Sequence, residues 1–344
     1  MALPHTKEIM RKLLAIISLS VLFVCCGQNR SKYVRLEGFA LGTTYSFILQ
    51  MHDTTGLQNG IDSLFKTIDM SMSVFNPSSL INRVNNNMTD SVDQFIAYCI
   101  SVARKVSEIS GGAYDITVKP VTEALGYSGG KVQQHPNIDS LLQYVGYDKI
   151  TVTGNRLSKA NSAMQIDLNS VAKGYACDLM GEFLEDKGVA DYIIEIGGEI
   201  FCKGKSPRGG EWRIGIDRPS EGNMIPGKEQ QATISLSGKG LATSGNYRQF
   251  YIDSSGRKVT HIVDARTGKS GLSDVLSATV IARTCAEADA AATMLTIVGL
   301  DQAQKLLEQH NEWDALLIYD DGKDGFTTYA TENLRGQLNT EKKK

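Results

Sequence analysis

The sequence predicts an α+β fold in which helices pack on mixed or antiparallel sheets. Strand and helix patterns alternate without the regular βαβ period of a parallel sheet, and hairpin patterns dominate the second half. The chain has 344 residues, which suffices for one large or two medium domains with a sizeable core. Its formal net charge of -2 gives no support for nucleic acid as a partner.

Strands are predicted where apolar residues alternate, or run together between turn residues. Gly42 permits a tight turn between the first two strands. The expected strands span residues 33–39, 43–51, 112–118, 165–168, 192–200, 212–216, 232–236, 249–252, 259–264, 275–282, 313–319 and 326–329, with a further hairpin at 150–157.

Helices are predicted where apolar residues recur every three or four positions. They span residues 57–70, 81–84, 93–110, 121–125, 138–145, 172–187, 285–296 and 300–310. Glycines at 111–112 and at 188 end two of them, as is common at helix C-termini. We expect these elements to form one folded domain at 33–336, followed by a disordered Lys-rich tail at 337–344.

The N-terminus predicts a lipoprotein signal. Three basic residues precede an uncharged apolar run at 13–24, which is too short to span a bilayer comfortably. The run ends in two cysteines, which predicts cleavage before a lipidated Cys26. The alternatives are lipidation at Cys25, a plain cleaved signal, or a short anchor. We expect residues 1–25 to be removed and residues 26–32 to form a lipid-anchored tether. The folded domain would then lie in the bacterial cell envelope, outside the cytoplasm on the periplasmic side.

The remaining cysteines lie far apart in the sequence, without a Cys-x-x-Cys pair or a Cys/His cluster. This spacing gives no support for a zinc or redox centre, and we expect buried free thiols. The four are Cys99, Cys177, Cys202 and Cys285.

The segment 165–178 is predicted to run from a strand end into a helix N-terminus. It places a carboxylate, a hydroxyl and an ammonium within seven residues, at Asp167, Ser170 and Lys173. Ser170 or Asn169 can cap the helix. Free N–H groups at such an end suit a phosphate or another anion. The alternative is an ordinary capped helix with a solvated Lys173.

Three further residues carry oxygen or nitrogen atoms that could bind a metal or transfer a proton. Asp289 and Thr293 are four residues apart on a predicted helix, so they share a face and offer hard oxygen ligands that favour Mg²⁺. The alternative is that Thr293 bonds back to the Asp289 carbonyl on a solvated face. His261 lies in a strand, between apolar residues and ahead of Asp264, where a core histidine is the alternative to a functional one.

The other candidate positions lie in loops and turns. Asp115 is either a turn cap or a ligand contact. Phe75 and Met72 lie in a polar loop, where they form the wall of a ligand site or pack beneath the loop. The two glycines at 197–198 allow a ligand to approach the backbone, but no Gly-x-Gly-x-x-Gly or P-loop pattern is present.

Taken together, these motifs resemble the ApbE family of flavin transferases (FAD:protein FMN transferases) in a lipoprotein form. The resemblance covers about residues 33–335, and at least seven of its motifs occur in family order. They are Leu-Gly-Thr at 41–43, Met-Ser-x-Phe-Asn-Pro-x-Ser at 72–79, Gly-Ala-Tyr-Asp-Ile-Thr-Val at 112–118, Ile-Asp-Leu-Asn-Ser-Val-Ala-Lys-Gly-Tyr-Ala-x-Asp at 166–178, Glu-Ile-Gly-Gly-Glu-Ile at 195–200, Ala-Thr-Ser-Gly-Asn-Tyr-Arg at 242–248, His-Ile-Val-Asp-Ala-Arg-Thr-Gly at 261–268 and Ala-Asp-Ala-x-x-Thr at 288–293. Leu41 and Ala265 depart from the family's usual Met and Pro.

The resemblance implies Mg²⁺-dependent transfer of FMN, through its phosphate, from FAD to a threonine or serine hydroxyl of an acceptor flavoprotein, with release of AMP. Asp289 and Thr293 would hold Mg²⁺ with a further oxygen from the turn at Ser170, and the helix end after Asp167 would lie near the pyrophosphate. His261 would act as base or orienting group, steered by Asp264. FAD would occupy a cleft between two subregions, lined by Leu41, Phe75, Ala113, Tyr114, Asp115, Asp167, Lys173 and Val263.

Two other functions fit the same residues. Water could replace the acceptor hydroxyl, which would make the protein an FAD pyrophosphatase that releases FMN and AMP. The protein could instead be a non-catalytic flavin-binding lipoprotein. As a transferase, it would have as partners FAD, an acceptor flavoprotein of a membrane electron-transport complex, and the membrane itself through its lipid.

Overall fold

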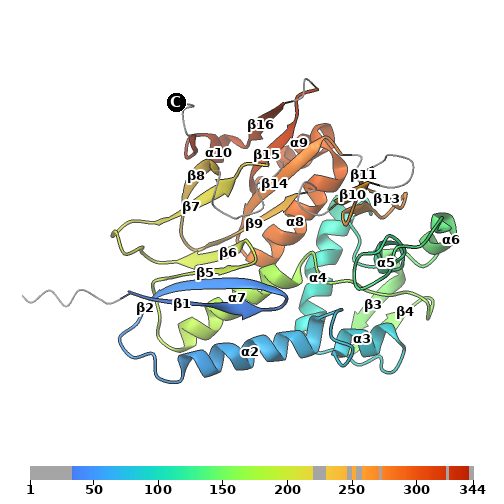
Figure 1. Ribbon diagram of the computed structural model, residues 1–344, viewed down its shortest axis with the longest axis horizontal. Coiled ribbons are helices and arrows are strands. Elements are labelled where there is room, and N and C mark those ends of the chain that lie inside the picture. Colours follow the sequence, from blue (N-terminus) through green and yellow to red (C-terminus); the bar gives the residue numbers. More distant parts are fainter. Residues whose placement is uncertain are drawn as a thin grey trace, which may run out of the picture. The chain divides into compact units, whose positions relative to one another are not determined.

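One antiparallel sheet organises the fold in the computed structural model, which describes residues 33–219, 230–245, 250–252, 258–270, 273–322 and 325–340. Its eight strands follow the order β1-β2-β5-β6-β9-β14-β15-β16 (Figure 1). Their bounds are β1 (Tyr33–Ala40), β2 (Thr43–Gln50), β5 (Tyr192–Ile196), β6 (Glu199–Lys203), β9 (Lys239–Gly245), β14 (Val275–Ala282), β15 (Asp314–Asp320) and β16 (Phe326–Ala330). The expected α+β class with antiparallel pairing is confirmed.

Two helices, α7 (Ala172–Asp186) and α8 (Cys285–Val298), pack on one face of this sheet (Figure 1). The contact is close, since a Cβ built on Gly240 of β9 would lie 2.3 Å from the Cys285 amide nitrogen. Further helices complete the same hydrophobic core. They are α2 (Leu57–Met72), α3 (Leu80–Asn85), α4 (Gln94–Ile109) and α9 (Leu300–Gln309).

The opposite face of the sheet is covered by a second, three-stranded sheet of order β17-β8-β7. Trp212 and Ile214 of β7 (Trp212–Asp217) pack there against residues of the large sheet such as Leu316, with β8 (Gln230–Leu236) and α10 (Glu332–Arg335) completing this core. The third strand, β17 (Asn339–Thr340), pairs with β8. The ordered chain therefore extends beyond 336, into the tail that the sequence predicts to be disordered.

A smaller subregion lies beside the helical layer and has its own apolar cluster, built on Val121, Val145, Val263 and Ala265. Its elements are α5 (Lys119–Ala124), α6 (Ile138–Leu142), the 3₁₀ turn η2 (Tyr147–Lys149) and two hairpins, β10 (Phe250–Ile252) with β11 (Lys258–Thr260), and β12 (Val263–Asp264) with β13 (Lys269–Ser270). A further hairpin, β3 (Ile150–Thr153) with β4 (Arg156–Lys159), instead packs Ile150 and Leu157 into the main core.

Most predicted elements are present, and four predictions are wrong in detail. Residues 112–118 form turns and not a strand, because the Asp115 carboxylate accepts hydrogen bonds from the Thr117 amide and hydroxyl. Segment 165–168 makes only an isolated bridge with Val118. The predicted strands 192–200 and 259–264 are each divided in two.

The lipoprotein signal and tether, residues 1–32, lie outside the described residues. Among the helices that are described, none has the length and apolar character needed to cross a membrane.

Candidate active site

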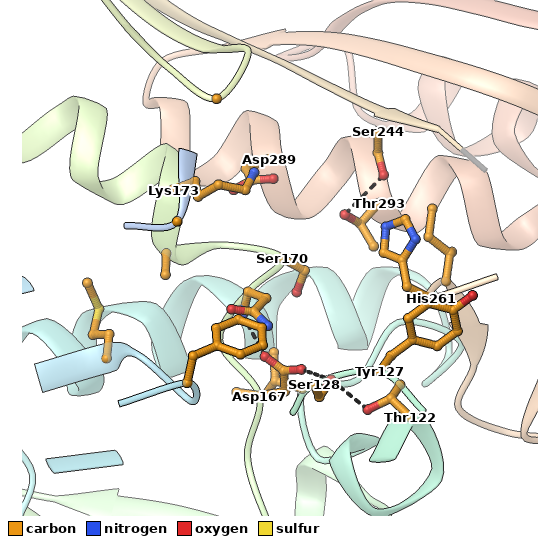
Figure 2. Close-up of a pocket in the computed structure, with 18 of the residues that line it drawn as sticks. Thr122, Tyr127, Ser128, Asp167, Ser170, Lys173, Ser244, His261, Asp289 and Thr293 are labelled. Atoms are coloured by element: carbon orange, nitrogen blue, oxygen red, sulfur yellow. Dashed lines mark hydrogen bonds between the residues drawn. The ribbon is translucent and has the colours of Figure 1, made fainter. Parts of the chain in front are cut away.

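A cavity of about 1050 Å³ lies between the helical layer and the smaller subregion. Its size is at the upper end for small-molecule sites, which suits a ligand as large as a dinucleotide. Its walls come from α7 and α8, from the hairpin turn at 41–43, and from the loop 126–130 together with residues 261–263 (Figure 2). The predicted cleft between two subregions therefore exists.

Helices α7 and α8 meet at one end of the cavity. The Gly174 amide donates to Asp289 Oδ2 at 3.0 Å. A Cβ on Gly174 would lie 2.3 Å from the Cys285 carbonyl oxygen, so only glycine permits this approach without a shift. Lys173 pairs with Glu199 of β6, whose Oε2 is buried and has no hydrogen-bond partner among the described residues.

The charges in this cluster are strongly coupled. Burial favours the neutral amine of Lys173, but the Asp289 and Glu199 carboxylates outweigh it and raise the Lys173 pKa. Burial also raises the pKa of Asp289, and raises that of Glu199 to about 7, although Lys173 opposes both shifts. One ammonium therefore serves two buried carboxylates, and a further cation would stabilise both in the charged form.

The oxygen atoms near Asp289 fit a hard cation. Asp289 is 5% exposed. Thr293 lies on the next turn of α8, and its hydroxyl oxygen is 3.4 Å from the hydroxyl oxygen of Ser244 on β9. Ser170 lines the same cavity and its hydroxyl lies 2.9 Å from the Tyr114 hydroxyl. In the described ranges no three His, Cys, Asp or Glu side chains form a metal cluster, so hydroxyl and backbone oxygens would have to complete the set, as Mg²⁺ allows.

This arrangement contradicts the alternative of a solvated face for Asp289 and Thr293. It also contradicts the predicted cap of α7. The N-cap residue is Val171, and the Ser170 hydroxyl is engaged with Tyr114. The first amides of α7 are partly used, because Ala172 donates to the Leu168 carbonyl at 2.8 Å and Gly174 donates to Asp289. The helix end thus offers fewer free N–H groups to an anion than the sequence suggests.

Asp167 lies on the wall of the cavity that faces the smaller subregion. Ser128 donates to Asp167 Oδ2, and the Asn169 amide donates to Oδ1 at 2.9 Å. Thr122 lies 2.9 Å from the Ser128 hydroxyl oxygen (Figure 2). Burial raises the pKa of Asp167 in spite of these donors.

His261 lies at the same end of the cavity as Thr293 and Ser244 (Figure 2). Its ring packs against Tyr127, with centroids 6.0 Å apart. Asp264 is engaged elsewhere, since its carboxylate accepts from the Arg266 amide at 2.9 Å and from the guanidinium at 2.7 and 3.0 Å. Steering of His261 by Asp264 therefore stays a prediction, and these contacts do not support it.

The other predicted contacts divide into two groups. Leu41, Phe75, Tyr114, Asp115, Lys173 and Val263 line the cavity. Ala113 is fully buried and instead fixes the wall, because its carbonyl accepts from the Ala265 amide at 3.0 Å. Asp115 acts as a turn cap and also accepts from the Tyr147 amide at 2.5 Å. Leu41 has φ 52°, a left-handed conformation rare for leucine and typical of strained functional sites.

Sequence reasoning assigned no role to several residues of the cavity, among them Glu199, Ser244, Ser128 and Tyr127. Glu199 follows two glycines at a predicted strand end, and an acidic residue in that position could have indicated a site residue. Ser128 and Tyr127 lie in a Gly-rich loop whose path depends on contacts distant in sequence, so no local pattern reveals them.

The fold and the site together define a class of protein. It is an α+β protein with two subregions, and its cleft combines a carboxylate–ammonium cluster, hydroxyl oxygens and a histidine. Enzymes that act on phosphate-containing ligands use groups of these kinds. The chain belongs to the ApbE family, whose model matches residues 41–317.

Known flavin transferases are similar to this chain over nearly its whole length. A relative named FAD:protein FMN transferase from Vibrio cholerae is 30% identical and covers 94% of this chain and 97% of its own length. One of the same name from Escherichia coli is 27% identical, covering 95% and 97%. The flavin transferase ApbE structure from Vibrio cholerae has TM-score 0.78 and 29% identity, covering 89% and 99%. The flavinyl transferase ApbE from Pseudomonas stutzeri has TM-score 0.79 and 27% identity, covering 89% and 96%.

Proposed function

We propose that this protein is an FAD:protein FMN transferase that moves FMN from FAD to a threonine or serine hydroxyl of an acceptor protein and releases AMP. The observation that carries the proposal is that His261 and Thr293 lie at the same end of one cavity. Thr293 is on α8, the helix that also carries Asp289. The relatives named FAD:protein FMN transferase support the choice of substrate.

The reaction exchanges one P–O bond for another. The acceptor oxygen attacks the FMN phosphorus, the bond from that phosphorus to the AMP oxygen breaks, and the hydroxyl proton passes to a base. We assign His261 as that base, since an imidazole titrates near neutral pH. We assign the Lys173 ammonium to bind phosphate oxygens and Asp167, which also lines the cavity, to orient the ligand.

We also propose that the reaction depends on Mg²⁺, held by Asp289 and Thr293 with an oxygen from the turn at Ser170. When bound, Mg²⁺ would neutralise phosphate charge and stabilise the transition state. Two features of this site favour a cation: the buried Asp289 carboxylate, and the Oε2 of Glu199, which has no partner in the part of the chain that the structure describes.

A product balance separates the three candidate functions. Residues 33–344 would be incubated with FAD, Mg²⁺ and a candidate acceptor domain, and nucleotides would be measured by chromatography. Transfer predicts AMP without an equal amount of free FMN. Equal AMP and free FMN, with a second acceptor also unmodified, would identify a pyrophosphatase. Bound but intact FAD would identify a flavin carrier.

We further propose that the protein is lipidated at Cys26 and anchored in the cell envelope, with its domain on the periplasmic side and an acceptor in a membrane electron-transport complex. The basic and apolar pattern of residues 1–25 supports this. Full-length protein expressed in a bacterium should partition into detergent, and its N-terminal peptide should carry acyl mass on Cys26. A Cys26→Ser variant that still carries acyl mass would move the site to Cys25 or refute the proposal.

A further inference from the structure

The loop Gly126-Tyr127-Ser128-Gly129-Gly130, here the 126–130 loop, contacts three separate parts of the cavity. Ser128 donates to the Asp167 carboxylate, and Tyr127 packs against His261. A Cβ on Gly129 would lie 4.0 Å from the Phe75 ring, so the loop also comes close to Phe75. Figure 2 shows Ser128 between Asp167 and Thr122, with Tyr127 next to His261.

The loop is held firmly against α5. The Tyr127 amide donates to the Thr122 carbonyl at 2.8 Å, and the Gly130 amide donates to the Tyr127 carbonyl at 2.8 Å. Gly130 passes so close to Glu123 that a Cβ would lie 2.3 Å from its carbonyl oxygen. Ser128 has φ 54°, a conformation that a serine adopts only when its surroundings enforce it. Its hydrogen bonds to Asp167 and Thr122 supply that constraint.

The Tyr127 ring is fixed at both ends. Its hydroxyl donates to the Val259 carbonyl at 3.1 Å, two residues before His261. One neighbour is the Tyr251 ring, with centroids 6.2 Å apart, and the other is the imidazole, with an interplanar angle of 60°. Such tilted aromatic contacts favour one ring orientation over others. Tyr127 therefore restricts both the backbone ahead of His261 and the imidazole itself.

We propose that the 126–130 loop is a positioning element of the transfer site, in which Tyr127 sets the His261 ring and Ser128 sets the Asp167 carboxylate. This inference rests on the proposed function of His261 as base. Neither residue needs to touch the reacting atoms. The loop connects Asp167, which would orient FAD, to His261, which would take the proton. A displacement of about 1 Å at a catalytic group can lower a rate by about 100-fold.

The two residues have different expected kinetic effects. In the full-length protein, Tyr127→Ala should lower kcat for FMN transfer by about 10-fold or more, with KM for FAD changed by less than about threefold. Tyr127→Phe keeps the ring contact with His261 but removes the bond to the Val259 carbonyl, so its kcat should fall between those of wild type and Tyr127→Ala. Ser128→Ala should raise KM for FAD by about 10-fold with little change in kcat, because it removes a charge-assisted hydrogen bond.

Matched variants outside the cavity serve as controls. Tyr329→Ala removes a half-buried tyrosine from β16, and Ser101→Ala removes a hydroxyl that bonds the Tyr98 carbonyl on α4. Both should leave kcat and KM unchanged. If Tyr127→Ala does not fold, as judged by circular dichroism, Tyr127→Leu replaces it. A wild-type kcat in the folded variant would overturn the role of Tyr127, and an unchanged KM in Ser128→Ala would overturn that of Ser128.

A second readout does not depend on transfer. The His261 imidazole resonances, assigned with His261→Gln, should shift in FAD-free Tyr127→Ala relative to wild type and to Tyr329→Ala. Unchanged resonances would overturn the proposed contact. If wild-type protein transfers no FMN to any acceptor, the proposed function fails, while these spectra still decide whether Tyr127 positions His261.

Discussion

The backbone amide of Gly174 donates to the Asp289 carboxylate across 3.0 Å, which joins the first turn of α7 to the second turn of α8. Two segments more than a hundred residues apart in sequence thereby form one wall of the cavity. The same bond orients the carboxylate that we propose as the main metal ligand. Stability of this helix pair and geometry of the site are therefore linked.

Gly174→Ala should destabilise the protein and reduce activity together. The new Cβ would lie 2.3 Å from the Cys285 carbonyl oxygen and 2.8 Å from Asp289 Cβ, so the helices must separate. Overpacking of this kind lowers the free energy of unfolding by about 1–3 kcal/mol. Chemical denaturation measures the loss. Gly210→Ala is the control, because nothing lies within 4 Å of that position. Equal stability of the two variants would contradict the close contact.

Asp178 makes the stability of the fold depend on pH. Its carboxylate caps α8 by accepting from the Cys285 and Ala286 amides at 2.7 and 2.9 Å, yet burial raises its pKa from 3.8 to about 7. The folded state holds a proton that the unfolded chain releases near pH 4. The contribution to stability is therefore complete below about pH 4 and is lost as the pH rises through about 7.

Urea unfolding of wild-type protein at pH 5 and pH 8 should show the part of this loss that falls between pH 5 and the folded pKa of about 7, at about 1.4 kcal/mol per pH unit. Asp178→Asn cannot titrate and should show a smaller difference between the two pH values. Asp186→Asn, on the exposed end of α7, should behave like wild type. If Asp178→Asn keeps the full wild-type difference, other groups carry the pH dependence.

Lys173→Met should be more destabilising at pH 8 than at pH 5. It removes the ammonium that serves both Asp289 and Glu199, and it leaves two buried carboxylates without a cation. Breaking a buried pair costs about 3–5 kcal/mol, and protonation of the carboxylates at pH 5 relieves part of that cost because burial already raises both pKa values. Thermal unfolding at the two pH values tests this. A larger loss of stability in Lys173→Met at pH 5 than at pH 8 would contradict this electrostatic explanation.

Thr293 should contribute to metal affinity through its hydroxyl. Thr293→Val keeps the shape and removes the oxygen, so the Mg²⁺ concentration for half-maximal transfer should rise by about 10-fold, as expected for loss of one oxygen ligand or its hydrogen bond. Thr293→Ser keeps the oxygen and should remain near wild type. FAD binding without metal should be equal in all three proteins. A Mg²⁺ titration in which the Val variant matches wild type would remove Thr293 from the site.

Local periodicity was sufficient to predict most helices and strands. The Ala-rich run in 285–296 and the Gly-Gly stop after 110 correspond to α8 and to the end of α4. The prediction failed where side chains compete with the backbone. Asp115 holds residues 112–118 in turns through Thr117, although their composition is that of a strand.

The site was predicted in part for a related reason. Asp289 and Thr293 share a helix face, so their spacing alone indicates a joint role. Glu199 and Ser128 enter the cavity through contacts with Lys173 and Asp167, which are 26 and 39 residues away in sequence. These two pairings are set by tertiary structure and leave no local pattern. Asp264 lies only three residues after His261, but its carboxylate is bonded by its neighbour Arg266.

The central claim is tested most directly by the intact mass of an acceptor domain after incubation with this protein, FAD and Mg²⁺. We predict one added FMN per acceptor, absent when the acceptor hydroxyl is removed, and lost with EDTA or in Asp289→Ala. FAD cleavage with an unmodified acceptor, for more than one candidate acceptor, would contradict transfer. Full modification by Asp289→Ala in the presence of EDTA would contradict the proposed metal site.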